Sequence, residues 1–150
     1  MTQSKAQRQI LVHGLALVFV GLVWGLAVPN TPFPRLGLTA HIQLIENGML
    51  LVVQALVLAG LPGLMGRLGT VVLVAAAWTT WPMALSEIAN AWWGTGHMLP
   101  IAAGQAGIAA GGEPWQELVV TLAHVVAALG FIAAWGFLLT AVLRRRMAES

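Results

Sequence analysis

The 150-residue chain is 59% hydrophobic and only 8% charged, with seven Lys and Arg residues against five acidic residues. A soluble domain carries about 25% charged residues, so a lipid bilayer is the expected solvent for most of this surface. Cys, Asp and Tyr are missing from the sequence, which excludes disulfides, thiolate metal sites and aspartate-based triads. The net charge of +2 is small and its basic residues lie at segment ends, so nucleic-acid binding is not expected.

Four apolar segments follow one another, at about residues 9–28, 40–60, 68–93 and 116–143. Each supplies the ~20 residues needed to cross about 30 Å of hydrocarbon. A Pro-rich connection, a short Pro-Gly turn and a long Gly- and Ala-rich stretch separate them. We therefore expect one all-α domain over residues 1–150, an integral membrane four-helix bundle.

The basic residues predict how this bundle is oriented. Only Arg35 lies on one side of a four-span chain. The other side carries Lys5, Arg8, Arg67, Arg144, Arg145 and Arg146. Because cytoplasmic loops are enriched in Lys and Arg, we expect both termini in the cytoplasm of a bacterium, with the chain in the inner membrane. An uncleaved signal peptide is the alternative interpretation of the first segment.

Polar residues gather on the second segment. His41 shares a helical face with Gly48, where a missing side chain would let a flat ligand approach the backbone. Gln43, Asn47 and Gln54 form a separate polar stripe, about 120° from His41 in the case of Asn47. The alternative is that His41 only forms a hydrogen bond near the start of the helix.

The third segment places Glu87 and Asn90 three residues apart on one helical face, and Trp81 and Pro82 precede them in the chain. Ionisable groups within a membrane usually face a partner, a cavity or a cofactor. We take Glu87 as a candidate proton carrier and Trp81 and Asn90 as candidate pocket residues. The alternative is a hydrogen-bonded cluster that fixes helix packing.

The fourth segment places Glu117 and His124 on one face, so they are a candidate proton relay or orienting pair. An interfacial Glu and a satisfied buried His are the structural alternative. In the first segment, Gly21 and Gly25 form a small-residue motif that permits close helix packing.

Several stretches together resemble the hydroxylaminobenzene mutase family of small bacterial membrane proteins. These are Pro34-Arg35-Leu36-Gly37-Leu38-Thr39-Ala40-His41, then Asn47-Gly48-Met49, residues 94–103, and Trp115-Gln116-Glu117. His41 followed after five residues by Asn47-Gly48-Met49 is also similar, more distantly, to styrene oxide isomerase. The sequence departs from the mutase pattern at Gln43, where that pattern tends to have an acid.

The resemblance implies a function and a cofactor. The mutase family implies rearrangement of a small hydrophobic aromatic substrate, an aryl hydroxylamine, to an ortho-aminophenol. Because such a substrate is apolar, we expect it to partition into the membrane lipid and enter from the side. The distant relative implies that His41 is the axial ligand of haem b, whose ferric iron acts as a Lewis acid. It also implies a homo-oligomer, with a trimer favoured, in which Asn47 lies by the substrate.

The leading hypothesis is therefore a membrane isomerase. Asn47, Glu87 and Glu117 are its candidate catalytic residues, and His41 and Gly48 its candidate haem-binding residues. The candidate substrate-pocket residues are Gln43, Trp81, Asn90 and His124. The alternatives are an epoxide-to-aldehyde isomerase, a non-catalytic haem- or quinone-binding membrane subunit, and a structural subunit without a site.

Overall fold

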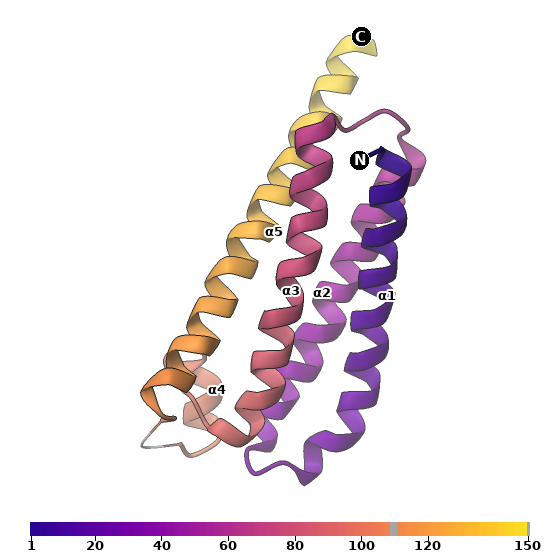
Figure 1. Ribbon diagram of the computed structural model, residues 1–150. Coiled ribbons are helices and arrows are strands. Elements are labelled where there is room, and N and C mark those ends of the chain that lie inside the picture. Colours follow the sequence, from indigo (N-terminus) through magenta and orange to yellow (C-terminus); the bar gives the residue numbers. More distant parts are fainter. Residues whose placement is uncertain (109–110, 150) are drawn as a thin grey trace.

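The computed structural model describes residues 1–108 and 111–149, and this part of the chain contains helices and loops only. Figure 1 shows the helices in chain order. They are α1 (Gln3–Ala27), the short 3-10 helix η1 (Val28–Asn30), α2 (Pro34–Gly60), α3 (Arg67–Trp93), α4 (Pro100–Gln105) and α5 (Pro114–Glu149).

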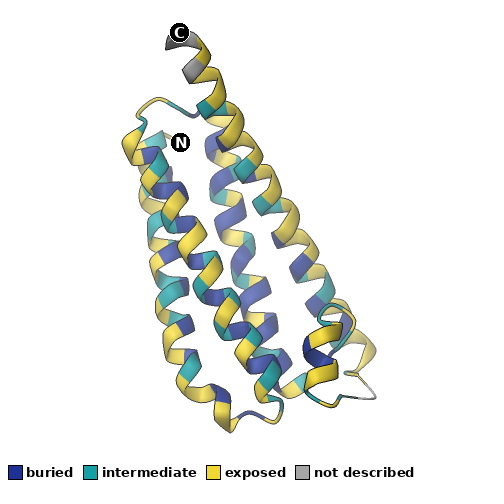
Figure 2. Cartoon of the chain, turned by 180° about the vertical axis from the view of Figure 1, so that it is seen from behind, coloured by how far each residue is buried: buried dark blue, intermediate teal, exposed yellow. Residues whose placement is uncertain are grey.

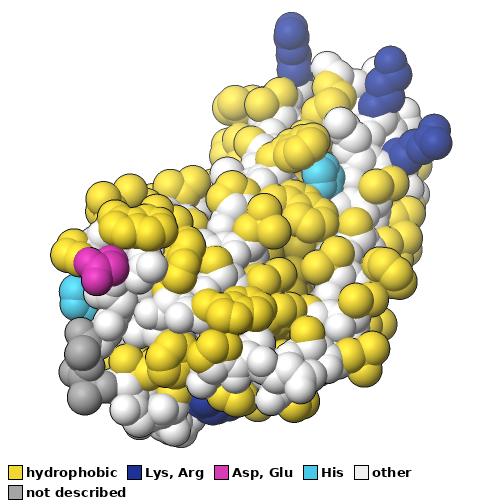
Figure 3. Space-filling model, turned by 60° about the horizontal axis from the view of Figure 1, so that its bottom comes forward, with side chains coloured by type: hydrophobic (Ala, Val, Ile, Leu, Met, Phe, Trp, Pro, Cys, Tyr) yellow, Lys and Arg dark blue, Asp and Glu magenta, His cyan; other side chains and the backbone are white. Residues whose placement is uncertain are grey.

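Within these residues, α1 with η1, α2, α3 and α5 are long and apolar enough to cross a membrane. Their flanks are covered with hydrophobic side chains, whereas most Lys and Arg side chains in view project from one end (Figure 3). The start of α1 and the end of α5 lie at this same end (Figure 1). The prediction of an all-α chain with four helices able to span a membrane is therefore confirmed for the described residues.

The helices extend past the predicted spans at three ends: α1 begins at Gln3 rather than near residue 9, α5 continues to Glu149 rather than ending near residue 143, and α2 also begins early. The stretch from 29 to 39 was expected to be a connection, but α2 already begins at Pro34. Proline suits the first helical position, because the missing N–H would have no intrahelical partner there. The turn after α2 contains Gly63 at φ +73°, as its Pro-Gly sequence predicts.

Helices α1 and α2 pack closely along glycine positions. A Cβ atom added to Gly48 would lie 2.7 Å from the carbonyl oxygen of Gly14, and one added to Gly14 would lie 2.8 Å from that of Gly48. Trp24 on α1 donates a 2.9 Å hydrogen bond from Nε1 to the carbonyl oxygen of Gly37 on α2. This tight pair forms one half of the molecule.

Helix α5 is held differently, since it packs along α3 and makes few close contacts with α1 or α2. The α3–α5 contact uses small residues, including the fully buried Ala127 and Ala134. A Cβ atom on Gly130 would lie 3.0 Å from Oγ1 of Thr79. The rest of α5 is mostly exposed (Figure 2), and α3 lies between α5 and the α1–α2 pair (Figure 1).

Candidate functional site

A cavity of about 430 Å³ lies between α2 and α5, with α3 beside it. Gln43 and Asn47 face it from α2, Met83 from α3 and His124 from α5. The remaining wall is apolar and comprises Leu50, Met98, Ala128, Phe131, Ile132 and Trp135. A few polar groups in an apolar pocket are typical of a site for a small aromatic molecule. Three predicted site residues, Gln43, Asn47 and His124, thus meet here.

Glu87 on α3 and His124 on α5 form a buried pair, in which Nε2 of His124 contacts Oε1 of Glu87. Nδ1 of His124 lies 2.7 Å from the carbonyl oxygen of Val120. A carbonyl oxygen only accepts, so Nδ1 carries a proton, and the Nε2–Oε1 contact holds one more. Whichever partner carries that second proton, the pair is neutral overall and has one proton to transfer.

The second oxygen of this carboxyl group is unusual. Glu87 is only 1% exposed, yet among the described residues its Oε2 has no hydrogen-bond partner. Buried acceptors without a partner are rare, and functional sites are one place where they occur. Glu87 does not line the cavity itself but lies behind His124, which does.

The position of Glu117 does not match the catalytic role predicted for it. One carboxylate oxygen accepts hydrogen bonds from the backbone N–H groups of Gly96 at 2.8 Å and Gly112 at 3.3 Å. The other accepts from the backbone N–H of His97 at 3.0 Å. Glu117 therefore attaches the loop after α3 to the start of α5. The Glu117–His124 pair suggested by the sequence does not form, because His124 pairs with Glu87.

Two other predicted pocket residues also lie outside the cavity wall. The buried Asn90 accepts a 2.7 Å hydrogen bond from the backbone N–H of Thr95, which fixes the loop that follows α3. Trp81 donates a 2.8 Å hydrogen bond from Nε1 to Nδ1 of His13 on α1. The geometry supports structural roles for both residues.

The ring of His41 packs against α1 at two glycines, Gly21 and Gly25. Its Nδ1 lies 2.8 Å from the carbonyl oxygen of Gly21, so Nδ1 carries a proton, and in the neutral tautomer with this proton the lone pair is on Nε2. A Cβ atom on Gly25 would lie 2.7 Å from Cε1 and Nδ1 of the ring, so this position has no room for a side chain. A histidine held through Nδ1 to a backbone carbonyl is suited to ligate a metal through Nε2. The donor chemistry thus fits the axial ligand of a haem.

The space expected over Gly48 is closed, however. The backbone of α1 fills it, because a Cβ atom on Gly48 would lie 2.7 Å from the Gly14 carbonyl oxygen and 2.8 Å from the Val18 nitrogen. The prediction that a flat ligand lies over Gly48 was therefore wrong. His41 also points about 160° away from Gln43 around α2, so one chain does not bring His41 to the cavity.

The sequence interpretation missed the residues that shape these two sites. In the sequence, Gly21 and Gly25 indicate only a packing motif, although both contact His41 in the structure. The apolar residues of α5 that line the cavity follow His124 at helical spacing. They are Ala128, Phe131, Ile132 and Trp135, and this spacing is the signal that could have found them.

Comparison with known proteins identifies the family. The styrene oxide isomerase family model matches residues 6–143. Hydroxylaminobenzene mutase HabB of Ectopseudomonas oleovorans is 33% identical over 146 residues, covering 90% of this chain and 83% of that protein. Hydroxylaminobenzene mutase HabA of the same organism is 33% identical over 149 residues, covering 92% of this chain and 99% of that protein. No solved structure matches significantly. The predicted resemblance is confirmed, and the chain belongs to the styrene oxide isomerase family of isomerases.

Proposed function

We propose that this isomerase converts an aryl hydroxylamine to an ortho-aminophenol in the cavity between α2 and α5. The observation that carries the proposal is the convergence of Gln43, Asn47 and His124 on one apolar cavity of about 430 Å³. The 33% identity to two hydroxylaminobenzene mutases favours this substrate class. An apolar substrate would concentrate in the bilayer and enter from the side, between α2 and α5.

The reaction leaves the molecular formula unchanged. The N–O bond breaks, oxygen becomes bonded to the ortho carbon, and the proton on that carbon is lost as the ring regains its aromaticity. The nitrogen gains one proton, so the net proton movement is from carbon to nitrogen. A buried neutral pair that holds one transferable proton suits this task, and His124 brings it to the cavity wall.

The amides have a separate role. Gln43 and Asn47 each offer N–H donors and a carbonyl acceptor from neighbouring turns of α2. We propose that these two amides form hydrogen bonds with the polar N–O end of the substrate, while Phe131 and Trp135 contact its aromatic ring. Orientation of this kind fixes which ring carbon lies next to the departing oxygen.

We further propose that His41 is the ligand of a haem b, through Nε2. When bound, ferric haem would supply a Lewis acid for the hydroxylamine oxygen. Because His41 faces away from the cavity of its own chain, the proposal requires a homo-oligomer, with a trimer favoured. In it, the α1–α2 face of one copy would meet the cavity of the next.

Product analysis tests the reaction. Purified protein in detergent should convert hydroxylaminobenzene to ortho-aminophenol, and Asn47→Leu should lower kcat/KM at least about tenfold by removing a polar contact to substrate. Gln9→Leu is the matched control, because Gln9 is an exposed amide outside this cavity. Faster conversion of styrene oxide to an aldehyde would instead favour the epoxide isomerase that the family model is named after. Equal activity of Asn47→Leu and wild type would place the reaction elsewhere.

An absorption spectrum tests the haem separately. Protein expressed with added haem should show a Soret band that His41→Ala abolishes and that shifts on addition of hydroxylaminobenzene. A colourless protein with full activity would refute the haem and leave the mutase proposal standing.

We also propose that the chain resides in a bacterial inner membrane with both termini in the cytoplasm. The basic side chains at the end that carries both termini support this orientation (Figure 3). Alkaline phosphatase fused after residue 149 should be inactive, whereas a fusion in the connection between η1 and α2 should be active. The opposite pattern would reverse the topology.

A further inference from the structure

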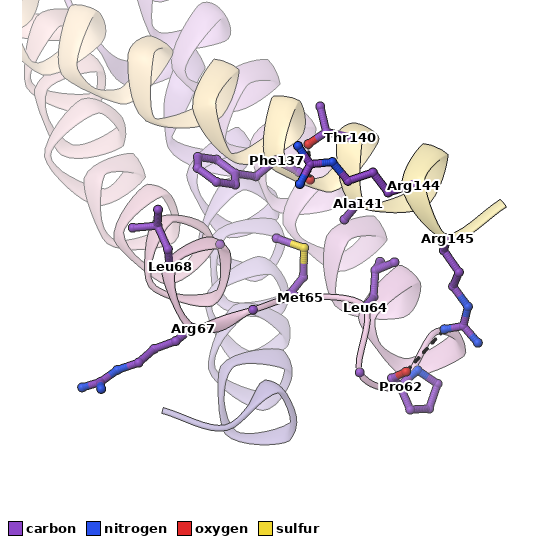
Figure 4. Close-up of a pocket in the computed structure, with 13 residues that line it drawn as sticks. Pro62, Leu64, Met65, Arg67, Leu68, Phe137, Thr140, Ala141, Arg144 and Arg145 are labelled. Atoms are coloured by element: carbon purple, nitrogen blue, oxygen red, sulfur yellow. Dashed lines mark hydrogen bonds between the residues drawn. The ribbon is translucent and has the colours of Figure 1, made fainter. Parts of the chain in front are cut away.

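A second cavity, of about 700 Å³, lies at the end of the molecule where the basic residues gather. The turn between α2 and α3, the first turn of α3 and the last turns of α5 enclose it (Figure 4). It shares no lining residue with the cavity of Gln43 and Asn47.

In the part of the chain that the structure describes, the charged residues lining this cavity are all basic. Among the described residues, Arg67, Arg144 and Arg145 line it and no carboxylate does. Arg145 donates a 3.3 Å hydrogen bond to the carbonyl oxygen of Pro62. In Figure 4 the guanidinium of Arg144 lies beside Thr140, and Arg67 extends outward at the rim. Such a lining attracts an anion.

The backbone adds further donors. Helix α3 begins after Gly66, which has no side chain to cap it, and its first turn contains no acidic residue. The first-turn N–H groups lack intrahelical partners, and the positive end of the helix dipole lies with them. Gly66, Arg67, Leu68 and Gly69 all line the cavity. Uncapped amides beside arginines form a favourable environment for a phosphate group.

The location and the remaining wall indicate where the phosphate comes from. The apolar spans of α3 and α5 begin and end here, at Arg67 and Arg145, which is the depth of the lipid headgroups. Leu64, Met65, Phe137 and Ala141 form an apolar part of the lining. A free phosphate would leave this apolar surface uncovered, whereas the glycerol and upper acyl chains of a lipid would cover it.

We propose that this cavity binds the phosphate of an anionic phospholipid. Arg144 and the first turn of α3 hold the phosphate, and Arg67 at the rim adds positive charge. The site then strengthens the link between the α2–α3 turn and the end of α5, whose closest packing in the bundle is along α3. This inference does not depend on the reaction proposed above.

Native mass spectrometry with titrated lipids tests the proposal. Phosphatidylglycerol should be retained over phosphatidylcholine, and each of Arg67→Gln and Arg144→Gln should weaken its binding about fivefold. Lys5→Gln is the matched control, because it removes one positive charge at the same end but lies outside this cavity. Thermal unfolding should show the same order, with phosphatidylglycerol raising the Tm of wild type and Lys5→Gln more than that of Arg144→Gln.

Two results would overturn the proposal. Equal weakening by Lys5→Gln and Arg144→Gln would show attraction to the charged surface rather than binding in the cavity. Stabilisation by inorganic phosphate alone, lost in Arg144→Gln and without any preference between the two lipids, would assign the cavity to a free phosphate.

Discussion

Replacing Glu87 by Gln separates the structural from the chemical role of the Glu87–His124 pair. The amide of Gln can donate a hydrogen bond to Nε2 of His124, so the buried contact survives while the transferable proton is lost. We therefore expect a folded protein whose rate is strongly reduced.

The expected changes in the free energy of unfolding follow from the burial of the Glu87–His124 pair. Glu87 and His124 are 1% and 5% exposed, so water does not replace a lost partner. Glu87→Leu should leave His124 without its Nε2 partner and lower the free energy of unfolding by about 3–5 kcal/mol. Glu87→Gln should cost less than about 1 kcal/mol, because the contact is kept. Loss of proton transfer should lower kcat by about 10²–10⁴, or about 3–5 kcal/mol of transition-state stabilisation.

Two measurements on the same samples give the result. Thermal unfolding in detergent reports stability, and chromatographic quantification of ortho-aminophenol reports kcat. Glu46→Gln is the matched control, because it removes an exposed carboxyl group from α2 that does not line the cavity. If Glu87→Gln keeps kcat within about threefold of wild type, the pair does not move the proton and the reasoning fails.

The remaining predictions concern α1 and the loop after α3. Glu117→Gln should release that loop, since a neutral amide oxygen accepts backbone N–H bonds less strongly than a carboxylate does; hydrogen exchange should speed up in the loop, and an unchanged rate would contradict the assignment. Gly25→Ala should displace the ring of His41 and lower the haem content after reconstitution. Gly136→Ala, which adds its Cβ in open space, should not change the haem content. Equal haem content in the two variants would show that contact with Gly25 does not position His41. Gly48→Ala should destabilise the protein by about 1–3 kcal/mol, because its Cβ would meet the backbone of α1 at 2.7 Å. An unchanged Tm would show that α1 can shift away from α2 without loss of stability.

The sequence predicted the helices because their signal is local. A run of apolar residues and the prolines and glycines that interrupt it suffice to mark four spans. The polar stripe of Gln43 and Asn47 also followed from helical periodicity, and both residues line the cavity.

The pairing of residues between helices could not be predicted in this way. Glu117 and His124 share a face of α5, which suggested a pair, but the partner of His124 comes from α3, 37 positions earlier in the chain. Periodicity tells which residues share a face and not which helix lies opposite. Gly48 illustrates the same limit, since its missing side chain admits the backbone of α1 rather than a ligand.

The attachment of α5 along a single helix bears on how substrate range can change. The distance between α2 and α5 determines the width of the cavity, and the small residues Ala127, Gly130 and Ala134 determine how closely α5 approaches α3. Adding one methyl group to this contact would widen the cavity without altering any residue that lines it. For the reaction proposed above, selection on these three positions can therefore tune the size of the aromatic ring system that fits the cavity, while Asn47 and His124 stay unchanged.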